Sequence, residues 1–106
     1  MVQKKIYGTR LKEARRQADL SQVQLGVLAG IDELASSARI SQYETGKHLP
    51  DLHTARRLAQ QLKTPLAFFF CEEDDLAELI LTFNQLDGVQ RQSVLQLLRS
   101  FSSSPR

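Results

Sequence analysis

Apolar residues recur along this chain at steps of three and four residues, and this spacing constrains the fold more than any other feature. At about 3.6 residues per turn, residues so spaced share one face of an α-helix. The pattern is clear near the N-terminus, where it is followed by Tyr7, Leu11, Ala14 and Ala18. No run shows the alternation typical of a half-buried strand. We therefore expect an all-α fold, with a first helix from about Ile6 to Gln17.

Residues that start and stop helices divide the rest of the chain. Ser21 and Gln24 have the spacing of a capping box, which predicts the start of a second helix. Gly30 can adopt the positive φ angle that ends it. Asp51 is placed to cap a fourth helix, and Pro65 suits the first turn of a short fifth.

The third helix has Ile40 and Tyr43 on one face. Its predicted start is Ser36 or Ser37, and Gly46 is its predicted end.

Two further helices are expected in the C-terminal third. The acidic residues 72–75 mark a boundary and the first turn of a sixth helix, where negative charge is favourable. Asp87 and Gln90 form a second capping box, which predicts a seventh helix through about Phe101. We expect the polar tail 102–106 to be frayed.

Composition excludes several classes of protein. Hydrophobic residues make up 42% and charged residues 25% of the chain, an ordinary globular balance. Cys71 is the one cysteine, which rules out an intrachain disulfide and a zinc site built on several thiolates. His48 and His53 lack a convincing acid partner, so we expect no metal site. The longest apolar run, 66–71, is too short for a membrane span, and no signal peptide is expected. We therefore expect a soluble cytoplasmic protein.

Charge is distributed unevenly. Residues 1–63 hold eleven Lys and Arg against six Asp and Glu, whereas residues 64–106 hold three against six. A basic N-terminal part suits a polyanion such as nucleic acid. Chance scatter of surface charge is the alternative interpretation. Five basic residues in or just before the first helix are expected to be solvated: Lys4, Lys5, Arg10, Lys12 and Arg16.

The stretch 20–50 carries the functional hypothesis. A short helix, a turn with glycine and a second short helix form the helix-turn-helix plan. The second helix of this plan fits the major groove of B-DNA, where base edges differ in donors and acceptors. With Ile40 and Tyr43 inward, its exposed face offers Ser37, Ala38, Arg39, Ser41 and Gln42. Gln can bond adenine in two places, and Arg can do the same with guanine.

At these residues the chain resembles a known family. The matching segments are Leu20-Ser-Gln-x-x-Leu-Gly-x-x-Ala-Gly-Ile31, then Ile40-Ser-Gln-Tyr-Glu-Thr-Gly-Lys47, then Pro50-Asp-Leu. Together they look like the DNA-binding domain of phage repressors and Cro, the xenobiotic-response-element (XRE) type of bacterial regulator. The resemblance covers about 6–70 and implies a five-helix domain that binds operator DNA.

The resemblance also implies roles for individual residues. Gln22 matches the residue that bonds a phosphate and braces the recognition helix. Lys47, with His48, matches a loop that grips the DNA backbone. The base-facing positions of the family correspond to Ser37, Ala38 and Gln42. Arg15 and Glu44 match an internal ion pair between the first and third helices.

Two departures from the family pattern stand out. Gly26 occupies the contact point between the second and third helices, where most members have alanine. The connection 31–36 is about four residues longer than usual, so either the turn bulges or the third helix begins early. Asp32 and Glu33 in this segment are expected to point away from phosphates.

The last two helices carry more apolar residues than a small appendage can hide. A homodimer interface is one explanation, and packing back onto the main domain is the other. Dimerisation would bring two recognition helices to successive major grooves.

These features together predict an all-α protein with two parts. Residues 1–71 form a five-helix, repressor-like DNA-binding domain, and residues 72–106 form a two-helix extension for dimerisation. The expected function is sequence-specific binding of double-stranded operator DNA, with repression as the simplest mechanism. We expect no cofactor and no enzymatic activity, because no catalytic constellation is visible. The alternatives are the antitoxin of a toxin–antitoxin pair, with a toxin as protein partner, and a helical protein-interaction module.

Overall fold

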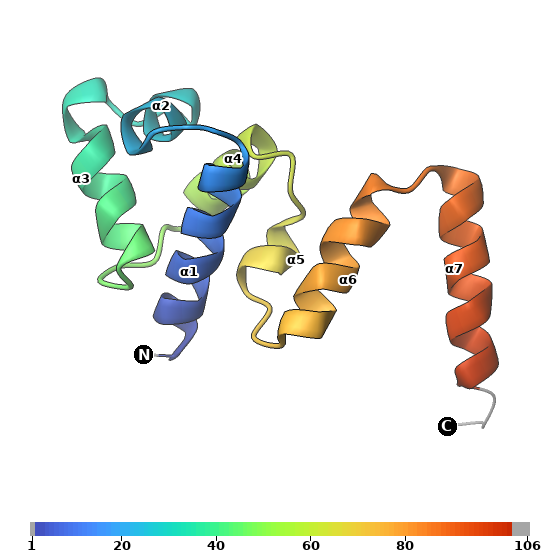
Figure 1. Ribbon diagram of the computed structural model, residues 1–106. Helices are drawn as coiled ribbons and strands as arrows, with labels where there is room; N and C mark the ends of the chain where they lie inside the picture. Colours follow the sequence, from blue (N-terminus) through green and yellow to red (C-terminus); the bar gives the residue numbers. More distant parts are fainter. Residues whose placement is uncertain (1, 103–106) are drawn as a thin grey trace.

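The computed structural model describes residues 2–102, and every regular element in that range is an α-helix (Figure 1). The all-α prediction is confirmed. The elements in order are α1 Val2–Gln17, α2 Gln22–Leu28, α3 Glu33–Glu44, α4 Leu52–Gln61, α5 Leu66–Phe69, α6 Asp74–Gln85 and α7 Gly88–Phe101. Of the tail expected to be frayed, residues 103–106 lie outside the described range.

The predicted capping residues are confirmed. Ser21 caps α2 and Asp87 caps α7, each in a reciprocal capping box with the glutamine three residues on. The carboxylate of Asp51 accepts a hydrogen bond from the Thr54 amide at the start of α4. Gly30, with φ 89°, follows α2, and Gly46, with φ 79°, follows α3. These groups satisfy backbone donors and acceptors that helix ends leave open.

The predicted start of the third helix, at Ser36 or Ser37, is wrong. α3 begins at Glu33, because Asp32 is its N-cap and accepts a hydrogen bond from the Leu34 amide at 3.1 Å. The long connection is therefore helix rather than a bulged turn. Asp32 precedes Ser36 and Ser37 in the chain, and its carboxylate already caps the helix at that earlier position.

The first helix also begins earlier than predicted, at Val2 instead of Ile6. Its first turn packs through its backbone against the loop after α3. A Cβ added at Gly46 would lie 3.3 Å from the Cα of Lys5. A contact of this kind requires no apolar side chain, so the hydrophobic pattern could not reveal it.

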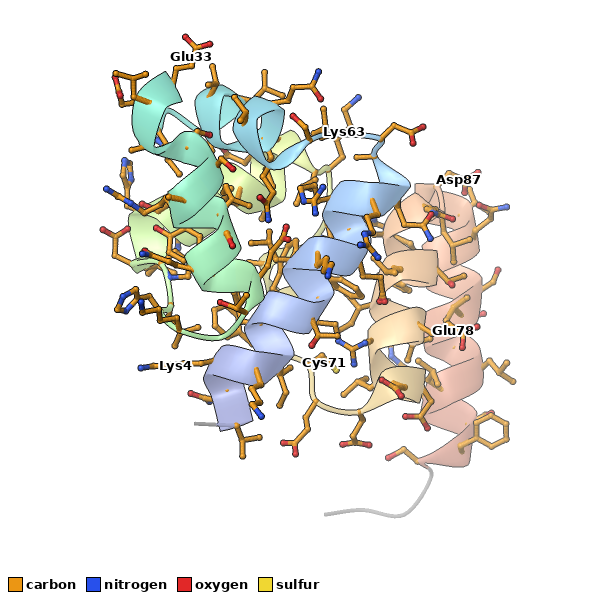
Figure 2. The ribbon with its side chains drawn as sticks, turned by 60° about the vertical axis from the view of Figure 1, so that its left-hand side comes forward. Lys4, Glu33, Lys63, Cys71, Glu78 and Asp87 are labelled. Carbon is orange, nitrogen blue, oxygen red and sulfur yellow. The ribbon has the colours of Figure 1, made fainter. Side chains whose placement is uncertain are left out.

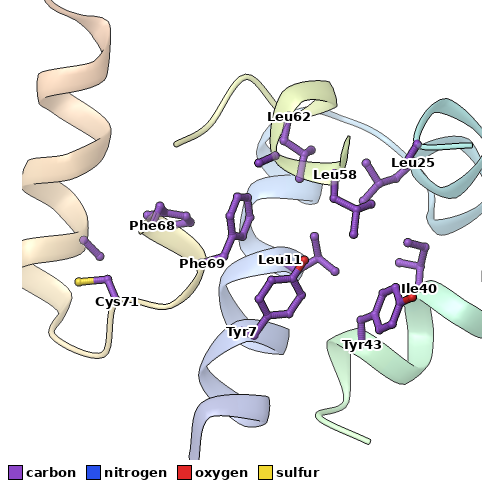
Figure 3. Packing of buried hydrophobic residues seen from close by; sticks show 13 residues of the cluster. Tyr7, Leu11, Leu25, Ile40, Tyr43, Leu58, Leu62, Phe68, Phe69 and Cys71 are labelled. Carbon is purple, nitrogen blue, oxygen red and sulfur yellow. The ribbon is translucent and has the colours of Figure 1, made fainter. Parts of the chain in front are cut away.

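The core lies between α1, α3, α4 and α5 (Figure 3). Tyr7 and Leu11 project from α1 towards Ile40 and Tyr43 of α3 on one side. On the other side the ring of Tyr7 lies 5.8 Å from that of Phe69. Burial of these large apolar side chains is the main favourable contribution to folding.

The three consecutive phenylalanines at α5 and its end differ in burial. Phe68 and Phe69 are buried, but Phe70 is exposed and covers one side of Tyr7, with a ring separation of 5.2 Å. Three consecutive residues around a single helical turn cannot all face inward. Cys71, which follows them, is buried beside Phe68 and Phe69 in the core cluster.

Arg10, expected to be solvated, is buried instead. Its guanidinium donates to the Cys71 carbonyl through Nε at 3.1 Å and Nη2 at 3.0 Å, and to Asp74 at 3.0 Å. It also lies over the ring of Phe68. Arg10 follows Tyr7 by three residues and therefore shares its inward face. This side chain ties α1 to the connection between α5 and α6.

The two C-terminal helices behave differently from each other. α6 joins the core through Ala77, with Ile80 and Leu81 packed at its edge. α7 contains no buried residue and stands apart from α1–α5 on the far side of α6 (Figure 1). Packing on the main domain therefore explains the apolar residues on one face of α6. It does not explain those of α7, which remain uncovered within the described residues. The division at residue 71 stays a prediction.

We expect Gly26→Ala to destabilise the protein by about 1 to 2 kcal/mol, because overpacking costs more than the gain in helix propensity. A Cβ at Gly26 would lie 1.7 Å from Ser36 Oγ and 2.9 Å from Ser36 Cβ. Gly88→Ala is the control, since nothing lies within 4 Å of a Cβ there. Urea unfolding of both variants checks this, and equal stabilisation of the two would contradict it.

Candidate nucleic-acid interface

The pair α2 and α3 is held together at very short range. Gly26 leaves space for the side chain of Ser36, which is fully buried. The Ser36 hydroxyl donates to the Val23 carbonyl of α2 at 2.9 Å. The glycine that departs from the family pattern is therefore matched by this serine, which fills the volume that an alanine methyl would take.

The register of α3 determines which side chains face outward. Ser36, Ile40 and Tyr43 are buried and share one face of the helix. On the opposite face lie Ala38 and Ser41.

The five residues of α3 that the sequence singled out all reach solvent, but helical spacing places Ser37 and Arg39 on opposite flanks of the helix. Ser37, Ala38 and Arg39 are exposed, and Ser41 and Gln42 are partly exposed. Ser37 and Gln42 lie on opposite flanks of the row formed by Ala38 and Ser41.

Gln22, at the start of α2, bridges two points on α3. Its Oε1 accepts a hydrogen bond from Ser37 Oγ at 3.4 Å, and its Nε2 donates to Glu44 Oε1 at 3.1 Å. The predicted bracing of α3 is thus present in the structure. The predicted phosphate contact of Gln22 stays a prediction.

The ion pair of Arg15 and Glu44 joins α1 to the end of α3. Arg15 Nε lies 2.5 Å from Glu44 Oε2, and Arg15 Nη2 donates to Glu44 Oε1 at 3.1 Å. Exposure is 12% for the Arg15 side chain and 3% for that of Glu44. The hydrogen bond that Arg15 donates to the Glu44 carboxylate raises the pKa of Arg15 above its ordinary value. Arg15 Nη1 also donates to the carbonyl of Leu20, so one guanidinium fixes α1, α3 and the entry to α2.

Lys47 lies in the loop after α3 and is exposed. The amides of Lys47 and His48 both donate to the carbonyl of Gln42, at 3.0 and 3.2 Å. The loop therefore folds back over the C-terminal end of α3. This places Lys47 near Gln42 and away from the Gln22–Ser37 contact.

The added first turn of α3 brings an unexpected residue to the outward face. Leu34 is 95% exposed and precedes Ala38 and Ser41 at helical spacing. Asp32 could have revealed this position of Leu34 in the sequence. A helix that has Asp32 as its N-cap includes Leu34 in its first turn, on the same row as Ala38 and Ser41. Asp32 and Glu33 are both exposed, with Glu33 at the tip of the helix (Figure 2).

Neither metal binding nor membrane insertion finds support in residues 2–102. No group of three or more His, Cys, Asp or Glu side chains in that range could hold a metal ion. No helix in the same range is long and apolar enough to cross a membrane.

Replacing Glu44 by Gln should destabilise the protein by about 3 kcal/mol, because it leaves the charge of the mostly buried Arg15 side chain without its carboxylate partner. Glu13→Gln is the control. It removes an ion pair with Arg10 at 3.9 Å in which the Glu13 side chain is 44% exposed, so we expect a loss below about 1 kcal/mol. Urea unfolding measures both changes. Equal small losses would contradict a structural role for the Arg15–Glu44 pair.

Comparison with known proteins gives a consistent result. The family described as "Helix-turn-helix domain" matches residues 6–67. The crystal structure of transcriptional regulator BswR superposes with a TM-score of 0.85 at 44% sequence identity, covering 88% of this chain and 92% of that one. A search of curated proteins finds no match. On the family match and this likeness, the chain belongs to the helix-turn-helix domain family.

Proposed function

We propose that this protein is an XRE-type transcriptional regulator, located in the cytoplasm, that binds operator DNA as a homodimer. The observation that carries the proposal is the outward position of Ala38 and Ser41 on α3, because their short side chains allow the helix to approach a groove floor closely. The position of α3 is fixed by the contacts of its Glu44 with Gln22 and Arg15. Repression by occluding a promoter is the simplest mechanism. The similarity to a transcriptional regulator supports the same class of function.

In this proposal different side chains of α3 contact different bases of the operator. Gln42 is the adenine reader and Arg39 a guanine reader, because each can make two hydrogen bonds to its base. Ser37, Ala38 and Ser41 contact base edges at closer range.

Contacts to the DNA backbone hold the helix in register. Gln22 contributes one from the start of α2 and Lys47 one from the loop after α3. Such contacts position the protein but carry no sequence information directly.

Dimerisation through residues 72–106 is the second part of the proposal. The uncovered apolar side chains of α7 support it, because a large exposed apolar surface indicates an interface. Two recognition helices about 34 Å apart would then meet successive major grooves on one face of a palindromic site.

An antitoxin remains the second candidate, because the uncovered face of α7 would also suit a partner protein. A helical interaction module without DNA binding is the third, since Ser37 and Ala38 are short for base readout. Co-purification of a small neighbouring toxin would favour the antitoxin. The interaction module predicts no salt-sensitive affinity for any DNA.

Fluorescence anisotropy on DNA from upstream of the protein's own gene tests the proposal. We expect preference over scrambled DNA and a steep salt dependence, because phosphate contacts release counterions. Gln42→Ala should reduce discrimination by about 1 to 3 kcal/mol, whereas Lys47→Ala should weaken binding to both DNAs and lower the salt slope by about 1.

Gln61→Ala is the matched control for Gln42, since Gln61 is exposed on α4 and away from α3. It should bind like the wild type. Equally weak binding to both DNAs, unaffected by Gln42→Ala, would contradict operator recognition at this DNA.

A further inference from the structure

Leu34, in the added first turn of α3, is the most exposed large apolar side chain among the described residues. It is 95% exposed, whereas the next, Val89, is 79% exposed. Because only burial removes apolar surface from water, this side chain contributes little to folding. Single exposed leucines are common on protein surfaces, so the surroundings of Leu34 decide what it can contact.

The side chain of Leu34 leaves α3 directly away from the core. With about 100° between successive residues, it lies within about 40° of Ala38 and about 20° of Ser41 around the helix axis. The buried residues of α3 are on the opposite side of the helix. Leu34 therefore extends the outward surface of α3 that the proposed function places in a DNA groove.

Leu34 is separate from the other exposed apolar surfaces of the protein. Val23, Val27 and Leu28 line a hollow on α2. Glu33 also lines this hollow, but its side chain leaves the helix about 100° away from that of Leu34. The uncovered helix α7 is at the far end of the molecule from α3 (Figure 1). A protein bound on either surface would therefore not explain the position of Leu34.

The start of α3 disfavours a DNA phosphate. Helix N-termini bind anions through free backbone amides. Here the Asp32 carboxylate accepts a hydrogen bond from the Leu34 amide at 3.1 Å, and Glu33 adds a second acidic group in the first turn. Since like charges repel, this end of the helix favours an uncharged base edge over a phosphate.

Thymine offers the matching apolar contact in the major groove. The N-terminal residues of a recognition helix contact base edges, and apolar side chains contact the C5 methyl of thymine. Leu34 precedes Ala38 by one helical turn, about 6 Å along the axis, or nearly two base-pair steps of about 3.4 Å. Resting on the proposed DNA binding, we infer that Leu34 contacts a thymine methyl in each half-site, within about two base pairs of the base that faces Ala38.

Replacing thymine by deoxyuridine removes only the methyl group and tests this contact. The probe is the tightest-binding duplex selected from a randomised library, with one thymine position at a time replaced in both half-sites. Measured by fluorescence anisotropy, wild-type affinity should fall about fourfold per half-site at one position, the value of one buried methyl group. Leu34→Ala should bind the unmodified duplex about fourfold or more weakly per half-site, and deoxyuridine at that position should cause no further loss.

Two further variants separate the methyl contact from other effects. Leu34→Met keeps a large apolar side chain and should retain the sensitivity to deoxyuridine. Leu28→Ala removes an exposed leucine from α2 and should keep the whole wild-type pattern. Leu34→Ala should fold normally, because the replaced side chain is exposed and alanine favours a helix. Circular dichroism checks the folding of all three.

Sensitivity to deoxyuridine that is the same in the wild type and in Leu34→Ala would overturn this contact while leaving operator binding intact. So would a wild type that binds every substituted duplex as tightly as the unmodified one. A selection that recovers no preferred sequence would instead overturn the proposed function.

Discussion

The mostly buried pair of Arg15 and Glu44 is the interaction on which the candidate interface depends. Glu44 is at the last turn of α3, so its carboxylate connects the recognition helix to α1 through Arg15 and to α2 through Gln22. The same guanidinium holds the Leu20 carbonyl at the entry to α2. A nearly buried ion pair costs desolvation and contributes little net stability. Its effect here is to fix the relative positions of three helices, and therefore the direction in which α3 faces.

The middle of this arrangement could be predicted from the sequence, because its signals are local. Ser21 with Gln24, Gly30 and Gly46 specify where α2 and α3 end or begin through hydrogen bonds within a few residues. The inward direction of Ile40 and Tyr43 follows from helical spacing. Gln42 was placed correctly on the accessible surface for the same reason, although its contact with DNA stays a prediction.

Other features depend on contacts between residues far apart in sequence, and these were missed. Arg10 was expected to be a solvated cation. It is buried, and its guanidinium donates to the backbone carbonyl of Cys71, 61 residues away. The early start of α1 depends on backbone contact with Gly46. The start of α3 was a local error of a different kind, since Asp32 was a better cap than the serines after it. As a result, the first turn of α3 and the place of Leu34 in it were not predicted.

Presentation of two copies of α3 to DNA by a symmetric dimer is our central proposal. Selection of binding sites from a randomised duplex library tests it most directly, because it assumes no operator. We expect an enriched two-fold symmetric motif, with half-sites about one helical turn of DNA apart or a multiple of it. Recovery of no motif, with equal retention of all sequences, would contradict it.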